Sequence, residues 1–227
     1  DIARSAAIHH QMTTVFFSLE MSRTELAMRI LSAEGKISMG RLKKGDLDTE
    51  GWTNLATLQG RIDSAPLFID DSPNMTLMEI RAKCRRLKQR NDLKLVVLDY
   101  LQLMSSGKKV ESRQQEVSEF SRSLKLLAKE LDVPVIALSQ LNRGSEQRTD
   151  KRPMVSDLRE SGSIEQDADM VILLHREDMY NPDSERVGEA DMIIAKHRGG
   201  PTRTIPLAFS GKYSRFNNMA NEAPPQY

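Results

Sequence analysis

The chain has 227 residues, of which 39% are hydrophobic, so it is long enough to bury one sizeable core. Its 33 Lys and Arg residues nearly balance its 32 Asp and Glu residues, which excludes a globally basic, nucleic-acid-binding surface and leaves only local clusters of charge. The single cysteine, Cys84, excludes an intrachain disulfide and a cysteine-based metal site, and no apolar run reaches the roughly 18 residues of a membrane span. We therefore expect a soluble, cytoplasmic protein with no membrane segment.

Apolar runs alternate with amphipathic stretches, which predicts βα units wound around a mostly parallel sheet. Helices should begin at two capping boxes, Ser22 with Glu25 and Thr76 with Glu79, where the hydroxyl and the carboxylate satisfy free N–H groups. A further helix is expected over residues 112–131, because Val117, Phe120, Leu124, Leu127 and Leu131 form an apolar stripe at helical spacing. We expect strands at residues 14–19, 66–69, 93–98, 134–139, 170–175, 191–196 and 203–208.

No stretch rich in Pro, Gly or Ser divides the chain, so we expect one domain over residues 1–217, followed by a flexible tail at 218–227. Three stretches fit neither a helical nor a strand period: 105–111, 142–157 and 177–189. A loop as long as the second is usually functional or disordered in a compact domain.

Three expected strands end in polar side chains that would meet at one edge of a parallel sheet: Glu20, Asp99 and Gln140. Asp99 is suited to a phosphate-bound Mg²⁺, although a helix N-cap or turn aspartate would follow a strand in the same way. Glu20 could orient or deprotonate a water that attacks a γ-phosphate, or could simply start a helix. Gln140 could sense a γ-phosphate or belong to an ordinary loop. Together, the three favour a nucleotide site.

A basic group, Lys196, His197 and Arg198, follows another expected strand and precedes a turn at residues 199–201. On such a projecting turn, Arg198 could act as an arginine finger for its own nucleotide or for that of a neighbouring subunit. The alternative is a solvated basic turn.

The segment 157–169 mixes one arginine with small and acidic residues. Arg159 and the backbone amides around Gly162 could hold a nucleic-acid phosphate, whereas the acids of the segment argue against general electrostatic attraction. The Walker A signature G-x-x-x-x-G-K-[ST] does not occur in the chain, so the usual cradle for nucleotide phosphates is missing.

Five segments together resemble the RecA-type ATPase domain of bacterial replicative DNA helicases of the DnaB family. They lie in the family's order at residues 17–21, 97–103, 137–143, 157–162 and 195–202, and the resemblance runs from residue 1 to about residue 219. It implies an α/β fold in which helices flank a mostly parallel twisted sheet. It also implies a homo-hexameric ring that hydrolyses ATP with Mg²⁺ at subunit interfaces, moves along single-stranded DNA and unwinds the duplex at the replication fork.

The resemblance also implies a role for each matching residue. Glu20 matches the glutamate that activates the attacking water, Asp99 the Walker B aspartate for Mg²⁺, and Gln140 the sensor glutamine. Lys196 and Arg198 match the basic pair that reaches into the neighbouring subunit's nucleotide site. The positions that match the loop contacting the DNA backbone are Arg159, Glu160 and Gly162.

Two departures from the family pattern bear on activity. Family members carry the Walker A loop immediately before a helix that resembles residues 1–10, and they carry an N-terminal helical collar that binds primase; this sequence contains neither. Primase and a helicase loader are the partners that the family implies. We expect this chain alone to hydrolyse ATP poorly or not at all. The alternatives are a RecA-like DNA-stimulated ATPase without unwinding and a non-catalytic DNA-binding ring component.

Overall fold

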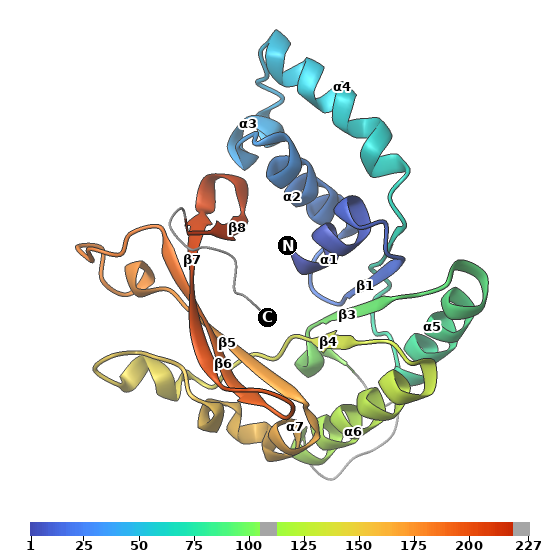
Figure 1. The fold of residues 1–227 in the computed structure, drawn as a ribbon, viewed down its shortest axis with the longest axis vertical. Coiled ribbons are helices and arrows are strands. Elements are labelled where there is room, and N and C mark those ends of the chain that lie inside the picture. The colour runs from blue at the N-terminus through green and yellow to red at the C-terminus, as the bar shows by residue number, and fades with distance from the viewer. Residues whose placement is uncertain (105–112, 220–227) are drawn as a thin grey trace.

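Two four-stranded sheets organise the chain in a computed structural model that describes residues 1–104 and 113–219, apart from the side chains of 113 and 159–161 (Figure 1). The first sheet is parallel, with strand order β2-β1-β3-β4. Its strands are β1 (Thr14–Ser18), β2 (Leu67–Asp70), β3 (Leu95–Asp99) and β4 (Val135–Ala137). Because all four run the same way, their carboxyl ends share one edge of the sheet.

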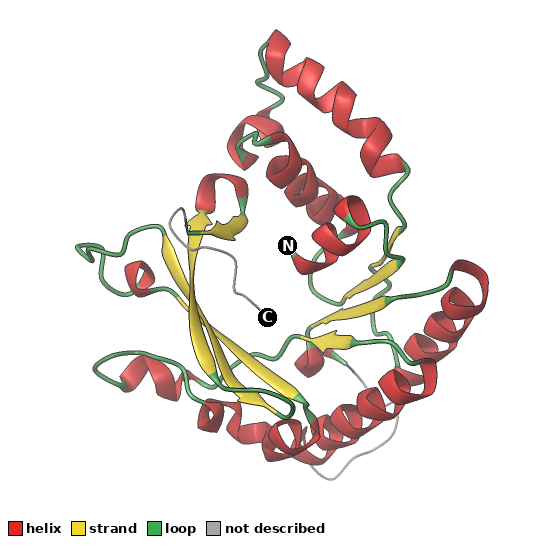
Figure 2. Cartoon of the chain, in the orientation of Figure 1, coloured by secondary structure: helices red, strands yellow, loops and turns green. Residues whose placement is uncertain are grey.

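Helices cover both faces of this sheet, as the coloured cartoon shows (Figure 2). The helices α1 (Ile2–Arg4) and α2 (Arg23–Gly35), with the π-helical turn η1 (Ser5–His9) between them in the chain, lie on one side (Figure 1). The longer helices α5 (Leu77–Asn91) and α6 (Arg113–Leu131) lie on the other side. Two further helices, α3 (Met39–Lys44) and α4 (Thr49–Asp63), extend away from the sheet beyond α2.

Both predicted capping boxes are confirmed, because Ser22 and Thr76 each accept a hydrogen bond from the backbone N–H of the glutamate three residues later. All five residues of the predicted apolar stripe on α6 are buried. They join the main core, in which Phe17 and Leu98 of the sheet pack with Ile80 of α5 and Phe120 of α6. Burial of this face holds α6 against the sheet.

The last four strands form a second, separate sheet, whereas we expected the strands of the chain to lie around one mostly parallel sheet. The second sheet is antiparallel, with β5 (Met170–His175), β6 (Glu189–His197), β7 (Arg203–Ser210) and β8 (Arg215–Asn218) in that order. Short connections at residues 198–202 and 211–214 join β6 to β7 and β7 to β8, and they favour antiparallel pairing because a parallel pair needs a long crossover. The longer loop 176–188 also joins an antiparallel pair, β5 and β6. The polar four-residue strand β8 was not predicted, and it includes Asn218, the first residue of the expected tail.

The remaining elements are short. Short helices occur at η2 (Leu101–Leu103), η3 (Arg143–Gln147), η4 (Val155–Ser161), α7 (Gly162–Asp167), η5 (Glu177–Met179) and η6 (Gly211–Tyr213). The predicted irregular stretch 105–111 and the predicted tail from residue 220 lie outside the described residues. Over residues 1–104 and 113–219, no helix is long and apolar enough to pass through a lipid bilayer.

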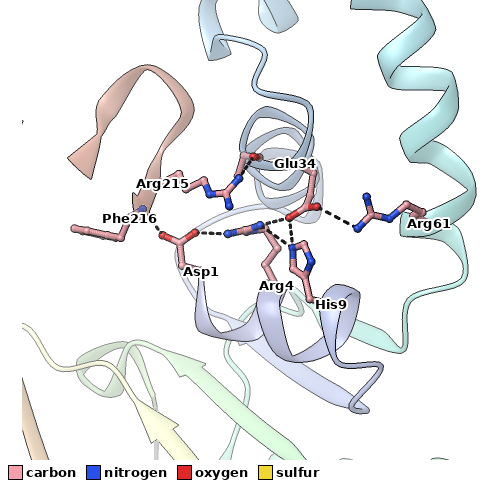
Figure 3. Close-up of polar contacts among 8 residues, drawn as sticks. Asp1, Arg4, His9, Glu34, Arg61, Arg215 and Phe216 are labelled. Carbon is pink, nitrogen blue, oxygen red and sulfur yellow. Dashed lines mark hydrogen bonds and ion pairs between the residues drawn. The ribbon is translucent and has the colours of Figure 1, made fainter. Parts of the chain in front are cut away.

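A cluster of charged side chains joins the N-terminal turns to α2 and α4 (Figure 3). The carboxylate of Glu34, whose side chain is 4% exposed, accepts hydrogen bonds from Arg4 and from His9 Nε2, the latter at 2.9 Å. Arg61 of α4 lies 3.8 Å from the other oxygen of Glu34. One buried acid therefore holds three basic side chains from separate elements.

The same region attaches the second sheet to the first layer (Figure 3). The backbone N–H of Phe216 in β8 donates to the Asp1 carboxylate at 2.9 Å. The guanidinium of Arg215 donates to the carbonyl of Ala33 in α2 at 3.2 Å. These contacts connect the end of the antiparallel sheet to α1 and α2.

Candidate nucleotide site

The carboxyl edge of the parallel sheet brings Glu20 and Asp99 together. Ser18 of β1 pairs with Asp99 of β3, and the N–H of Leu19 donates to the carbonyl of Asp99 at 2.8 Å. The buried Ser18 hydroxyl then donates to the carbonyl of Met21 and accepts from its N–H, at 2.7 and 3.1 Å. This tight turn leaves Glu20 exposed at the sheet edge, beside the strand that ends in Asp99.

The charge of Glu20 acts on Asp99 at this acidic edge, the carboxyl end of β1 and β3. Partial burial raises the pKa of Asp99 above its usual range, and the negative charge of Glu20 raises it further, while Arg29 of α2 partly offsets both effects. Among the described residues, neither the Glu20 nor the Asp99 side chain makes a hydrogen bond or salt bridge. Negative charge is therefore concentrated here without full compensation, as is typical of functional sites.

These residues fit a Mg²⁺ that arrives with a nucleotide. Mg²⁺ is usually held by one or two carboxylates together with substrate phosphates, and not by a cage of protein ligands. Within the described part of the chain, no group of three or more His, Cys, Asp or Glu side chains could form such a cage. Asp99, half-buried and lacking a bonded cationic partner there, is the carboxylate best suited to the ion.

Gln140 lies two residues past Leu138, at the same edge as Asp99. The Leu138 N–H donates to the carbonyl of Leu98 at 2.9 Å, which continues the parallel alignment of β3 with β4. The Gln140 side chain is exposed and has no hydrogen-bond partner in the described parts of the chain. Its backbone, in contrast, is fixed by the side chain of Gln102.

The basic pair lies at the end of β6 in the second sheet, with Lys196 inside the strand and Arg198 just after it. Lys196 Nζ donates to the carbonyls of Glu165 and Gln166, and Arg198 forms an ion pair with Asp169 at 3.3 Å. Over residues 1–104 and 113–219, no hydrogen bond or salt bridge joins this pair to Glu20 or Asp99. The structure thus brings the sheet-edge residues together but does not connect the basic pair to them within one chain.

The predicted DNA-contact positions lie at the end of η4, where Arg159 and Glu160 are, and at the start of α7, which is Gly162. The side chains of Arg159 and Glu160 lie outside the described parts of the structure. Gly162 begins α7 with ordinary helical backbone angles, and a side chain placed there would meet no atom within 4 Å. It borders a cavity of about 470 Å³ that Arg148 and Asp157 also line.

An ion pair missed in the sequence holds the long loop 142–157 in place. Arg148 donates to both oxygens of the buried Asp157 carboxylate, at 2.9 and 2.5 Å. The N–H of Met154 donates to the same carboxylate at 2.7 Å, and the N–H of Asn142 donates to the Asp157 carbonyl at 3.0 Å. The sequence offered only a mixture of charges here, and no spacing rule pairs these two residues.

Comparison with known proteins gives a consistent family. A family model described as "DnaB-like helicase C terminal domain" matches residues 1–218. The chain is 69% identical to a replicative DNA helicase DnaB of Leifsonia xyli subsp. xyli and 54% identical to one of Geobacillus stearothermophilus, covering 97% and 96% of this chain. It spans 48% of each of these relatives, about half their length.

Two solved structures are similar over nearly the whole chain. One is described as the ATPase domain of G40P, with a TM-score of 0.92, 41% identity, and coverage of 96% of this chain and 78% of that one. The other is a DnaB-like replicative helicase described with its interactions with primase, with a TM-score of 0.89 and 42% identity, covering 93% of this chain and 51% of that one. These likenesses confirm the predicted α/β, RecA-like fold class.

Proposed function

Because the chain belongs to the family of DnaB-like helicase C-terminal domains, we propose that it is the motor domain of an ATP-dependent replicative DNA helicase. In this proposal, ATP hydrolysis at subunit interfaces drives movement along single-stranded DNA and unwinding of the duplex at the replication fork. The observation that supports it most directly is the acidic edge, where Glu20 and Asp99 follow from the paired strands β1 and β3 and have no bonded partners among the described residues.

Each residue of the edge has a task that its position suits. Exposed Glu20 orients the attacking water and accepts its proton, which is the role of a general base. Asp99 would hold Mg²⁺, directly or through water; the chemistry that the ion supplies when bound is neutralisation of charge on the phosphates. The free amide of Gln140 can donate to a γ-phosphate oxygen and so respond to its presence.

The basic pair fits a role in a neighbouring subunit. Arg198 is exposed and only weakly held by Asp169, since both side chains are 61% exposed, so water screens this ion pair. We propose that Arg198, with Lys196, reaches the nucleotide of the next subunit in a homo-hexameric ring. Arg159, Glu160 and Gly162 would then contact the DNA backbone in the central channel.

Partners follow from the family. One structural neighbour is described with primase, and we propose primase and a helicase loader as partners of the intact protein, acting in the cytoplasm. The Walker A signature is absent from the sequence, so the chain alone should hydrolyse ATP poorly.

Hydrolysis measurements test the proposal. The extended chain, defined here as residues 1–227 preceded by a Walker A segment and an N-terminal domain of the family, should hydrolyse ATP faster with single-stranded DNA. Glu20→Gln should lower this rate by roughly 10²- to 10⁴-fold, the usual contribution of a general base. The matched control is Glu185→Gln, which changes an exposed glutamate far along the chain in the loop before β6. Equal rates for Glu20→Gln and the control would contradict the assignment.

The trans role of Arg198 has its own test. Arg198→Ala should reduce DNA-stimulated hydrolysis by roughly 10³- to 10⁵-fold, as for other arginine fingers, while nucleotide affinity stays within a few-fold. Mixing the variant with Glu20→Gln subunits should restore some activity, because mixed rings contain interfaces with one intact residue of each kind. Arg86→Ala on α5 is the control. No restoration on mixing would place Arg198 in its own subunit's site.

A further inference from the structure

Gln102 makes an unusual set of contacts just past the acidic edge. It lies in η2, three residues after Asp99. Its side-chain oxygen accepts from the N–H of Gln140 at 3.1 Å, and its side-chain nitrogen donates to the carbonyl of Gln140 at 3.2 Å. The same nitrogen donates to the Ser139 hydroxyl at 2.9 Å.

The side-chain amide of Gln102 bonds to the backbone of Gln140 in the way that a residue of a neighbouring strand would. A primary amide carries a donor and an acceptor together, as a peptide unit does, so it can satisfy both backbone groups of one residue. Backbone pairing between the two segments ends with the Leu101 N–H, which donates to the carbonyl of Leu138 at 3.0 Å. The Gln102 side chain continues this pairing for one more residue, after β3 and β4 have ended.

The contact between Gln102 and Gln140 lies between the proposed nucleotide site and the proposed DNA-contact segment. Gln102 and Gln140 line a cavity of about 330 Å³ that Asp157 and Leu158 also line. Beyond Gln140, the N–H of Asn142 donates to the carbonyl of Asp157, which precedes the proposed DNA-contact residues. The segment from 139 to 142 is thus held at one end by Gln102 and at the other by Asp157.

We propose that Gln102 is a positioning residue that fixes the backbone of Gln140 relative to Asp99 and transmits the state of the nucleotide edge to the DNA-contact segment. This inference rests on the proposed helicase function. Gln102 touches neither nucleotide nor DNA in this scheme and acts through Gln140. Its loss should therefore affect stimulation by DNA more than nucleotide binding or basal turnover.

Three variants of the extended chain test this role. Gln102→Ala removes every amide contact, whereas Gln102→Glu keeps an acceptor for the Gln140 N–H and places a second oxygen against the Gln140 carbonyl. Gln89→Ala, an exposed glutamine on α5, is the control. DNA-stimulated kcat should fall about tenfold in Gln102→Ala and less in Gln102→Glu, with KM for ATP and basal kcat within about threefold of the parent. Equal loss of basal and stimulated rates, or no loss, would overturn the proposal.

A second measurement does not depend on hydrolysis. In residues 1–227, hydrogen exchange at the Gln140 amide should be slow in the parent and in the control, and at least about tenfold faster in Gln102→Ala. Unchanged exchange would refute the positioning role, whatever the ATPase results. If the parent extended chain hydrolyses no ATP, the proposed function fails, and faster Gln140 exchange in Gln102→Ala still supports the backbone contact on which the inference is built.

Discussion

Replacing Asp157 by alanine should destabilise the domain by releasing the loop 142–157. The Asp157 side chain is 5% exposed and receives two hydrogen bonds from Arg148 and one from the Met154 N–H. Alanine would leave the Arg148 guanidinium with the carbonyl of Arg152 as its remaining bonded acceptor among the described residues. A partly buried positive charge would then lack its counter-ion.

The size of the effect follows from burial. Breaking a buried ion pair by removing one partner costs roughly 3–5 kcal/mol, and the lower end applies because the Arg148 side chain is 28% exposed. We therefore expect the free energy of unfolding to fall by about 3 kcal/mol. Adding Arg148→Met should recover part of this loss, since the double variant no longer contains an unpaired charge.

Urea unfolding of residues 1–227 measures the change, with Asp183→Asn, an exposed aspartate, as the control. The pH dependence gives a second check. Hydrogen bonding from Arg148 is the main cause that lowers the pKa of Asp157, so the folded state binds fewer protons at this site than the unfolded state. The stabilisation is complete above the ordinary aspartate pKa and disappears as the pH falls through the lowered pKa. A variant as stable as the control at neutral pH would refute this reasoning.

Three other changes have distinct expected outcomes. Asp99→Asn should raise the thermal midpoint of the nucleotide-free chain, because burial and Glu20 raise the pKa of Asp99 and make its charged form costly at neutral pH. The same change should abolish stabilisation by Mg²⁺ with ATP. A lowered midpoint without nucleotide would contradict this prediction. Cys84 should resist alkylation at pH 8 until urea unfolds the chain, since burial raises the pKa of its thiol to about 12, and rapid native labelling would be inconsistent. Glu34→Gln should lower the free energy of unfolding by about 2 kcal/mol, measured in urea, because buried Arg4 loses a charged acceptor; no change would show that the cluster adds little.

Local sequence rules accounted for much of the parallel half. The capping boxes at Ser22 and Thr76 work within four residues, so their signal does not depend on the rest of the fold. The apolar residues of α6 recur at helical spacing, and this spacing alone predicts which face of the helix is buried. Placing Glu20, Asp99 and Gln140 at one edge needed only the rule that parallel strands end together. Their chemical roles stay predictions until the substitutions above are measured.

The same rules did not predict the pairing of the antiparallel sheet. Strands β5 to β7 read as apolar runs like those of the first sheet, and hydropathy does not encode whether the next strand returns by a turn or by a crossover. The four residues of β8 carry too little apolar pattern to mark a strand. Its extended conformation comes from pairing with β7.

The sequence by itself determined where the capped helices α2 and α5 begin, which face of α6 is buried and which strands end in carboxylates, because these depend on neighbours within a few residues. Only the tertiary structure decided the partners of polar side chains: Gln102 with Gln140, Arg148 with Asp157, and Glu34 with Arg4 and His9. Many polar residues along a chain could form such a bond equally well. Which of them meet depends on the register of the strands and on the path of the loops, and both are fixed by packing of the whole chain.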